Sequence, residues 1–410
     1  MKNESLNPRE TFNARSIGLL LVHLAFVLTG VVTTLLGPML PVLSARWALS
    51  DKQAGYLFTA QFVSSTAGVA ISGLMIRRVG YRAVMTIGMG AMAIGAVALW
   101  HGGWLGGIAS VGVYGLGIGF VSPTANLVVA ELSPGKRAAA LNVLNFSWGL
   151  GAVGCPFAVA FLVVSHHALL FMYALAAALA LVALTFSVTP LAGLRAPQAQ
   201  QKHADLLSLW RNPMVIIFGL LFFLYVGAEN CIAGWLASYT QRMQSAAGAF
   251  WALTPSLFWA ALLIGRATAP GLLRHLEEKR LASIGLLIAS CGVVCLLMAR
   301  AVGVVSIGVA ITGLGLASVF PICIALMSEQ FGEMAPRTAG LMFALAGLGG
   351  ATLPNLVGLL STRLGSLRIG LGIPLLSSLV MLILFSLLDR KTGERTPSRA
   401  RAVSSSRMPA

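Results

Sequence analysis

The chain repeats one pattern from Ile17 to Leu388, in which a long apolar run is followed by a short polar break. A run of about 20 apolar residues is long enough to cross a hydrocarbon core of about 30 Å as an α-helix, so each run predicts one transmembrane helix. The predicted helices cover twelve ranges: 17–41, 53–76, 83–100, 107–130, 138–164, 168–189, 213–240, 250–273, 281–299, 302–328, 338–361 and 367–388. The sequence therefore predicts an all-α integral membrane protein.

The composition agrees with this class of protein. The 410 residues are 57% hydrophobic and 10% charged, with a mean hydropathy of +0.86, whereas soluble domains carry about 25% charged residues. The first apolar run is too long for a signal-peptide core, so we expect it to remain as a helix. No enzyme chemistry is visible, and we expect no metal site and no cofactor other than a coupling ion, H⁺ or Na⁺.

The basic residues predict the orientation in the membrane. When the 28 Lys and Arg residues are sorted by alternate breaks, 22 fall on the side of the N-terminus. The six on the other side are Arg46, Lys52, Arg242, Arg300, Arg363 and Arg368. The positive-inside rule then puts both termini in the cytoplasm, in a bacterial-type inner membrane. The net charge of +16 fits this orientation and contact with the anionic lipid bilayer, so nucleic acid is not an expected partner.

The two halves of the chain repeat one another at an offset of 198 residues. The stretch "GLGIGFVSP", which begins at Gly115, aligns with "GLGLASVFP", which begins at Gly313, and the same offset pairs Glu131 with Glu329. An even number of helices in each repeat means that both copies insert with the same orientation. The sequence therefore predicts two parallel six-helix bundles.

The domain boundaries follow from this repeat. We predict a cytoplasmic N-terminal tail (1–16), an N-terminal bundle (17–189), a cytoplasmic linker (190–211), a C-terminal bundle (212–388) and a basic cytoplasmic tail (389–410). The linker is polar and contains Pro and Gln, as linkers commonly do. We expect a monomer.

One acidic residue, Glu229, is predicted to lie deep in a membrane-spanning helix. A buried charge costs about 2.5–3.5 kcal/mol even on lenient insertion scales, so the residue is a candidate for exchanging a proton as a site opens to water. A helix broken around Gly227 and Gly234 would instead supply carbonyl oxygens for sodium. A third interpretation is a protonated side chain that only joins two helices.

Uncharged polar side chains accompany Glu229 in the predicted spans. The candidate substrate contacts are Gln61, Asn126, Asn142, Asn145, Trp148, Tyr225, Asn230, Trp235 and Asn355. As a set they suit a ligand rich in hydroxyl groups, because amides offer donors and acceptors while indole faces stack on sugar rings. Singly, each of them can equally join two helices. His23 has the same two interpretations, a helix-packing contact or a proton relay with Glu229.

The stretch "GLMIRRVGYR" is similar to the signature loop between the second and third helices of the major facilitator superfamily. The resemblance covers nearly the whole chain and implies alternating access around a site between the two bundles. Arg77 stands where that pattern has Asp, so we expect Glu131 to serve as the acidic partner of the loop. The residues of this gating group are Gly73, Arg77, Arg78, Gly80, Arg82, Glu131 and Arg137. Alternatively, the arginines only fix the topology.

Three stretches resemble the fucose and glucose/galactose symporter branch of that superfamily: "FLYVGAENCIAGWLASY", "GFVSPTANLVVAELSP" and "ALNVLNFSWGLGA". The resemblance matches Asn126 and Asn145 to polar positions of helices four and five, and Glu229 to the acid of helix seven. The fucose symporter pattern also has acids on helices one and four, and this chain has none there. If coupling exists, Glu229 therefore acts almost alone, or sodium is the ion.

The expected function is alternating-access transport of a small neutral polyhydroxylated solute, a monosaccharide, coupled to a cation through Glu229. The main alternative is proton-driven efflux of drugs or metabolites, but the Arg of helix four and the glycine–proline element of helix five that mark such antiporters are missing. Carriage of organic anions is not expected, because Arg266, the cation nearest a membrane centre, is predicted in the cytoplasmic third of its helix. The sugar, the ion and the direction of transport stay open.

Overall fold

The computed structural model describes residues 8–133, 135–163, 167–189, 211–243 and 250–393. The N-terminal half contains α1 (Pro8–Thr34), α2 (Leu36–Trp47), α3 (Asp51–His101), α4 (Trp104–Leu132), α5 (Arg137–Ala158), a π-helical turn (Val159–Val163) and α6 (Ala168–Val188). The C-terminal half contains α8 (Pro213–Met243), α9 (Phe250–Leu272), α10 (Glu278–Met298), α11 (Val302–Leu316), α12 (Val319–Phe331), a 3₁₀ turn (Gly332–Met334), α13 (Ala335–Leu364), α14 (Leu367–Gly370) and α15 (Gly372–Gly393).

The helices confirm the predicted all-α membrane fold. In the described part of the chain, 11 helical segments are long and apolar enough to cross a membrane. One of these segments, α3, has 51 residues and contains both the predicted second helix and the predicted third helix. The 11 segments therefore agree with the twelve predicted crossings. The offset of the repeat also reappears, because Trp104 and Arg137 begin α4 and α5 while Val302 and Ala335 begin α11 and α13.

The turn inside α3 depends on Gly80. Its backbone has φ 80° and ψ 168°, whereas the residues around it are helical. Only glycine adopts such a conformation without strain. The glycine of the signature loop is therefore needed to reverse the chain between two membrane-spanning helices.

Three predicted helices are each divided in the structure: 367–388 is divided between α14 and α15, and a proline explains the breaks in the other two. The predicted helix 17–41 is divided between α1 and α2, because Pro38 lacks the N–H that would bond to the carbonyl of Thr34. The predicted helix 302–328 is divided between α11 and α12, where Pro321 leaves the carbonyl of Ala317 without its helical donor. We did not predict any of these breaks.

The ends of the bundles differ from the predicted boundaries. Helix α1 begins at Pro8 instead of at residue 17, and α15 continues to Gly393 beyond the predicted end at 388. The predicted linker, 190–211, lies outside the described residues except for Arg211, and so do residues 1–7 and 394–410 of the two predicted tails.

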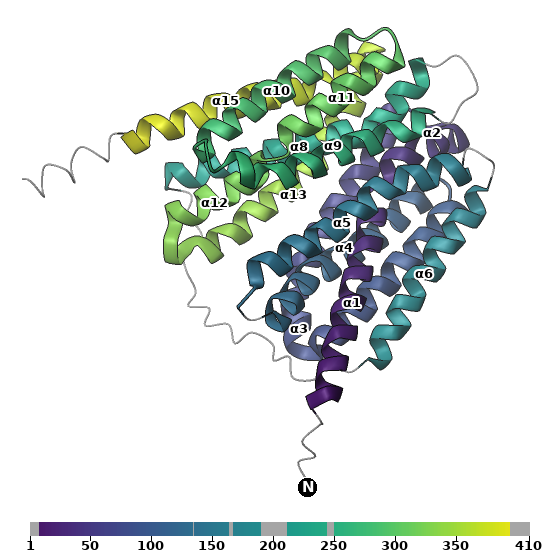
Figure 1. Cartoon of the computed structure of the whole chain (residues 1–410). Helices are drawn as coiled ribbons and strands as arrows, with labels where there is room; N and C mark the ends of the chain where they lie inside the picture. Colours follow the sequence, from purple (N-terminus) through teal and green to yellow (C-terminus); the bar gives the residue numbers. More distant parts are fainter. Residues whose placement is uncertain (1–7, 134, 164–166, 190–210, 244–249, 394–410) are drawn as a thin grey trace, which may run out of the picture.

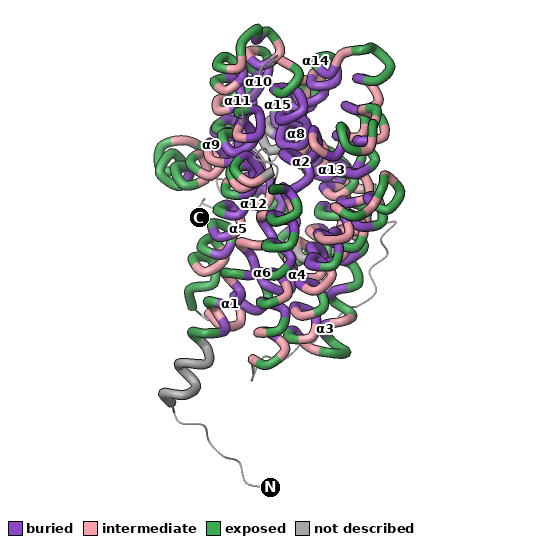
Figure 2. The backbone as a smooth tube through the Cα atoms, turned by 90° about the vertical axis from the view of Figure 1, so that its right-hand side faces the viewer, coloured by how far each residue is buried: buried purple, intermediate pink, exposed green. Residues whose placement is uncertain are grey.

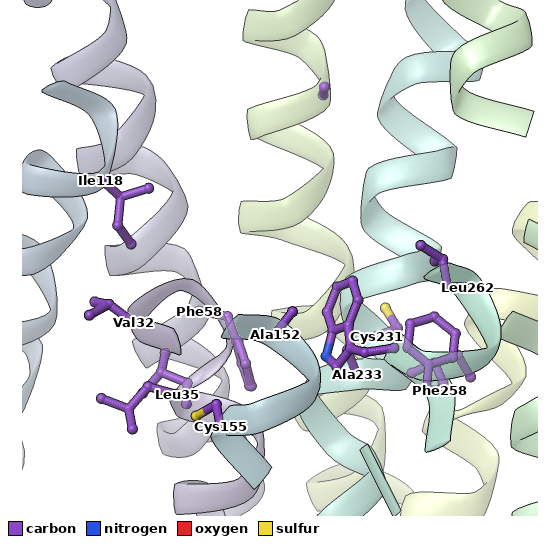
Figure 3. Close-up of a cluster of buried hydrophobic side chains, with 14 of the residues drawn as sticks. Val32, Leu35, Phe58, Ile118, Ala152, Cys155, Cys231, Ala233, Phe258 and Leu262 are labelled. Atoms are coloured by element: carbon purple, nitrogen blue, oxygen red, sulfur yellow. The ribbon is translucent and has the colours of Figure 1, made fainter. Parts of the chain in front are cut away.

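The two bundles lie beside one another and diverge toward the end where α12 and the N-terminal part of α1 lie (Figure 1). They meet at the opposite end, through α3 against α13, α5 against α9 and α2 against α8. The approach is close, since a Cβ added at Gly37 would meet the carbonyl oxygen of Ala233 at 2.5 Å. Figure 3 shows apolar side chains of both halves, among them Phe58 and Phe258, lying near one another here.

Large apolar side chains are exposed around the outside of the molecule. Leu20, Ile94 and Phe161 are 71%, 66% and 76% exposed, and exposed and half-buried positions alternate with buried ones along the outer helices (Figure 2). Such a surface is unfavourable in water and suits lipid. The chain is therefore built as a multi-pass membrane protein.

Candidate substrate and ion site

Glu229 lies one residue beyond the midpoint of α8. The residue is 9% exposed, and its Oε1 accepts a hydrogen bond of 3.1 Å from the hydroxyl of Tyr225, one turn earlier on the same helix. The sequence placed Glu229 deep in this helix and named Tyr225 as a candidate substrate contact, but it did not predict the hydrogen bond between them. A carboxyl group in this position has lost most of its water and depends on protein partners.

The partner that we did not predict is Arg266 of α9. Its Nη2 lies 3.3 Å from Glu229 Oε1 and 3.4 Å from the hydroxyl oxygen of Tyr225. The long arginine side chain carries its charge along the helix away from its own Cα, so a residue placed by sequence in the cytoplasmic third reaches the middle of α8. The expectation that no cation takes part in the site, because Arg266 lies in the cytoplasmic third of its helix, therefore does not hold, and Glu229 does not stand alone.

This ion pair is loose and incompletely satisfied. One nitrogen of the guanidinium makes both contacts, and the arginine side chain is 29% exposed. Its Nε is buried without a hydrogen-bond partner. An unpaired buried donor costs about 1–3 kcal/mol, so the pair has unused capacity to bind an oxygen atom.

Helix α8 is not broken, which corrects the idea of a sodium site made from an unwound helix. It runs without interruption from Pro213 to Met243. Gly227 and Gly234 instead allow close packing, because an added Cβ would meet a Leu353 side-chain atom at 2.4 Å in the first case and Phe58 at 2.7 Å in the second. No carbonyl oxygens are released for an ion at these glycines.

Aromatic rings of the C-terminal half surround the triad of Glu229, Arg266 and Tyr225. The ring of Tyr225 stacks on Phe320 of α12 with centroids 5.2 Å apart and an angle of 28°. Phe320 in turn lies 6.3 Å from Phe343 of α13, which is 46% exposed. We did not select these phenylalanines from the sequence, because isolated aromatic residues in apolar runs give no signal of a site.

The N-terminal half faces this region through the contact of α5 with α9. Trp148 meets Trp259 edge to face, with centroids 5.4 Å apart. Gly149 lies against Leu263, because a Cβ added there would be 2.8 Å from its side chain. Trp259 is a further residue that the sequence did not reveal.

The register of these antiparallel helices places Asn145 and Arg266 on the same side of the Gly149–Leu263 contact. Asn145 comes four residues before Gly149 on α5, and Arg266 comes three residues after Leu263 on α9, so both lie one turn beyond the Gly149–Leu263 contact in the same direction. Asn145 is exposed, and its Nδ2 donates 2.9 Å to Leu141 O of its own helix. That bond leaves the amide oxygen and a second N–H of Asn145 for a ligand.

The other candidate amides divide into two groups. Asn126 and Asn230 are half-buried, and each donates to a carbonyl of its own helix at 2.8 Å. Asn142 is exposed one turn before Asn145, and Asn355 is half-buried where its Cα would lie 3.0 Å from a Cβ added at Gly55. The first three stay available to a ligand, while Asn355 belongs to the contact between the halves.

Gln61 and Trp235 have the helix-joining role that we considered as the alternative. Gln61 is 3% exposed, donates 2.9 Å to Thr33 O and accepts 3.0 Å from the hydroxyl of Tyr114. The indole of Trp235 is fully buried and donates 2.9 Å to Pro354 O. These contacts use the polar groups that a substrate would need, so we leave both residues out of the site.

His23 is joined to its own bundle. Its Nδ1 lies 2.9 Å from Ser147 Oγ, between α1 and α5. The hydrogen bonds of the described residues do not link it to Glu229, whose Oε1 contacts Tyr225 and Arg266. The contact with Ser147 therefore supports the helix-packing interpretation of His23, and no described contact supports a proton relay from His23 to Glu229.

Glu131 contacts the signature loop, as expected, but through Tyr81 and not through an arginine. Glu131 accepts a 2.5 Å hydrogen bond from the hydroxyl of Tyr81, which follows Gly80 directly. The arginines of the gating group are exposed: Arg77, Arg78, Arg82 and Arg137. Gly73 has open space around it. In this conformation Tyr81, rather than an arginine, joins the loop to α4.

A second ion pair clamps the halves together at the other end. The carboxylate of Asp51, at the start of α3, accepts hydrogen bonds from both terminal nitrogens of Arg242, at the end of α8. Ser361 of α13 donates to the same carboxylate, and Lys52 N donates 2.9 Å to Thr362 Oγ1. These residues lie on the side predicted to face away from the cytoplasm.

Comparison with known proteins identifies the family. The model of the Major Facilitator Superfamily matches residues 22–354. The chain belongs to this superfamily. A "Glucose/galactose transporter" of Brucella abortus biovar 1 (strain 9-941) is 23% identical over 392 residues, which cover 87% of this chain and 91% of that protein.

Two further members extend the comparison. A "Sodium-dependent glucose transporter 1A" of Mus musculus is 23% identical over 416 residues, covering 89% of this chain and 94% of that protein. The fucose:proton symporter of E. coli shares the fold, with a TM-score of 0.62, 19% identity and coverage of 91% of this chain and 99% of that chain. Together with the helices described above, these matches agree with the fold and with membership of the superfamily.

Proposed function

We propose that this chain moves a monosaccharide-sized, polyhydroxylated solute across the bacterial inner membrane by alternating access, coupled to a cation through Glu229. The observation that carries the proposal is the position of Glu229, which is paired with Arg266 at the middle of α8, while α5, the helix of Asn145 in the other bundle, packs against α9, the helix of Arg266. Hydroxyl groups of a sugar suit the amides of Asn145 and Asn142, and the rings of Trp148 and Trp259 suit an apolar sugar face.

The contacts between the halves support one state of an alternating-access cycle. The bundles are held together where Asp51 contacts Arg242 and Thr59 donates 2.7 Å to Ala351 O. At the opposite end, Glu131 and Tyr81 contact one another within one half. If both termini are cytoplasmic, this is a conformation closed to the outside, and return to the outward state requires the Asp51 contacts to break.

The surroundings of Glu229 favour a proton over sodium as the coupling ion. Sodium needs several oxygen ligands, whereas the unbroken α8 releases no carbonyl oxygen, and an arginine already contacts the carboxylate. Arg266 disfavours any added positive charge at Glu229, a proton as well as sodium, but a proton needs no further oxygen ligands. The relatives named above do not decide the question, since one of them carries "sodium-dependent" in its name and another "proton symporter".

The test is uptake into proteoliposomes. A panel of monosaccharides is offered with an inward proton gradient, with an inward sodium gradient, and with neither. The proposal expects accumulation of one sugar class above equilibrium under the proton gradient alone. Flux that no gradient drives uphill would mean facilitated diffusion, and the absence of any sugar flux or binding would reject the substrate class.

A further inference from the structure

The least explained feature of the site is the unsatisfied guanidinium of Arg266. Its Nε is buried and unpaired, its one direct contact with Glu229 is 3.3 Å long, and its side chain is 29% exposed. Arginine presents its N–H groups as a planar fork that matches a carboxylate with two parallel hydrogen bonds. The loose contact with Glu229 Oε1 does not use this fork.

We propose that the transported solute carries a single negative charge, as a sugar acid does, and that its carboxylate binds Arg266 while a proton occupies Glu229. The proposal rests on the proposed function, and it names the substrate class of the same site. The hydroxyl groups of the acid contact Asn145 and Asn142 of the opposite bundle, so that one end of the ligand is held by each half.

The argument is the balance of charge inside the membrane. In the empty carrier, Glu229 and Arg266 neutralise one another. With a proton on Glu229 and a carboxylate on Arg266, the site is again neutral, because the incoming charges cancel. A carrier with the proton alone keeps an unpaired cation, and one with the anion alone keeps an unpaired carboxylate. An uncompensated charge in the bilayer costs several kcal/mol, so the two half-loaded forms do not cross.

This charge balance couples the movement of the proton to the movement of the anion without a second acid. It therefore explains how coupling can occur although helices one and four carry no acid. A neutral sugar behaves differently in the same site. Its binding leaves the pair intact, so it would cross without a proton, and adding the proton would leave Arg266 uncompensated. The charges therefore favour proton symport for a sugar acid and uncoupled passage for a neutral sugar.

The neighbouring groups allow the exchange. Tyr225 donates to Glu229 and lies 3.4 Å from Arg266 Nη2, so its hydroxyl can stay bonded to either group when the pair separates. Among the other acids and histidines that the sequence analysis considered, His23 contacts Ser147 and Asp51 contacts Arg242. In the described residues, the proton is therefore assigned to Glu229.

The experiment compares matched neutral and acidic sugars in proteoliposomes of the full chain. The pairs are glucose with glucuronate, galactose with galacturonate, and mannose with mannuronate. We expect an acid to be accumulated under an inward proton gradient, with no dependence on a membrane potential clamped by potassium and valinomycin, because one proton and one anion move together. We expect its neutral counterpart to compete at least about tenfold more weakly, the loss for one charge-assisted contact.

The outcomes separate the two proposals. If a neutral sugar is carried and neither its acid nor any other acid is carried or competes, the sugar-acid inference falls and the proposed function stands. If no member of any pair is carried or bound, the proposed function fails. Accumulation of an acid that depends on the membrane potential would overturn the charge balance.

Variants of Arg266 give an independent readout by binding. Arg266→Gln is expected to weaken binding of the acid by about 10–100-fold and binding of the neutral sugar by much less, and Arg266→Lys is expected to recover part of the loss. Arg274→Gln, an exposed position just beyond the end of α9, is the matched control. Equal weakening of both ligands by Arg266→Gln would show a structural role and contradict the inference.

Discussion

Two ion pairs in the described part of the chain have the same chemistry, but one joins the two bundles and the other lies within one bundle. Asp51–Arg242 connects the N-terminal bundle to the C-terminal bundle at the end of the helices, and Glu229–Arg266 lies within the C-terminal bundle. The first arginine side chain is 48% exposed and meets the carboxylate with two nitrogens, whereas the second is 29% exposed and uses one. A pair between the halves must break in every cycle, and a pair within one half need not.

The surroundings of each pair fit this difference. An exposed ion pair contributes about 0–1 kcal/mol, so the Asp51 contact stabilises one state without trapping it. Removing one partner of a buried pair costs about 3–5 kcal/mol, so Glu229 and Arg266 separate only when other charges replace them. Under the proposed function, the same residue types therefore form a reversible clamp at one place and respond to the charge of the ligand at the other.

The largest effect is expected from leaving Arg266 without its acid. Glu229→Leu strands a cation among buried groups, and we expect it to lower the free energy of unfolding by about 3–5 kcal/mol. The double variant Glu229→Leu/Arg266→Leu removes both charges and should recover most of that loss. Thermal unfolding of the purified protein in detergent measures both. Equal losses in the single and double variants would contradict the pairing.

A smaller effect is expected at the clamp. Asp51→Asn removes the charge between the halves and should shift the equilibrium between the two states about fivefold, as a contribution of about 1 kcal/mol implies. The shift can be measured as the rate of disulfide formation between cysteines introduced at Lys52 and Thr362, whose backbone and side chain are in contact. The charge exchange Asp51→Arg/Arg242→Asp should restore the rate of disulfide formation. An unchanged rate in Asp51→Asn would show that the ion pair does not hold the halves together.

Asn145 tests whether the N-terminal bundle contributes to the site that Arg266 faces. Asn145→Ala removes hydrogen bonds of about 0.5–1.5 kcal/mol each, so we expect the half-saturation concentration for uptake to rise about tenfold at most. Ser187→Ala on α6, a half-buried residue whose hydroxyl donates to Leu184 O of its own helix, is the control. A half-saturation concentration that stays the same would reject Asn145 as a contact.

The smallest effect is expected at Tyr225. Tyr225→Phe keeps the ring that stacks on Phe320 and removes the hydroxyl between Glu229 and Arg266. We expect a loss of a few-fold in proton-driven uptake, since one neutral hydrogen bond contributes about 1 kcal/mol, with little change in unfolding temperature. A complete loss of uptake would mean that the hydroxyl itself carries the proton.

The sequence was sufficient for the fold and for half of the central pair. Apolar runs of membrane-spanning length predicted the helices, and Glu229 stood out because an acid within such a run is expensive. Arg266 is subject to the same rule, so an arginine inside the run of α9 was a signal that it needs a partner. It was overlooked because position along a helix does not show how far a long side chain reaches.

Other features had no sequence signal. Asp51 and Arg242 are separated by 191 positions and belong to different bundles, so their contact follows from the docking of the halves. The stacking of Tyr225 on Phe320 likewise depends on how α12 turns after its break near Pro321. Gln61 shows the opposite error. We named it as a substrate contact because it is polar and lies in a membrane span, but its hydrogen bonds join helices.

The central claim, that the Glu229 carboxyl couples a proton to transport, is tested most directly by Glu229→Gln in proteoliposomes. The variant resembles the permanently protonated state, so we expect accumulation under an inward proton gradient to be lost while exchange of labelled for unlabelled substrate across the membrane continues. Wild-type protein under the same gradients is the reference. Proton-driven accumulation at the wild-type level in Glu229→Gln would contradict the account.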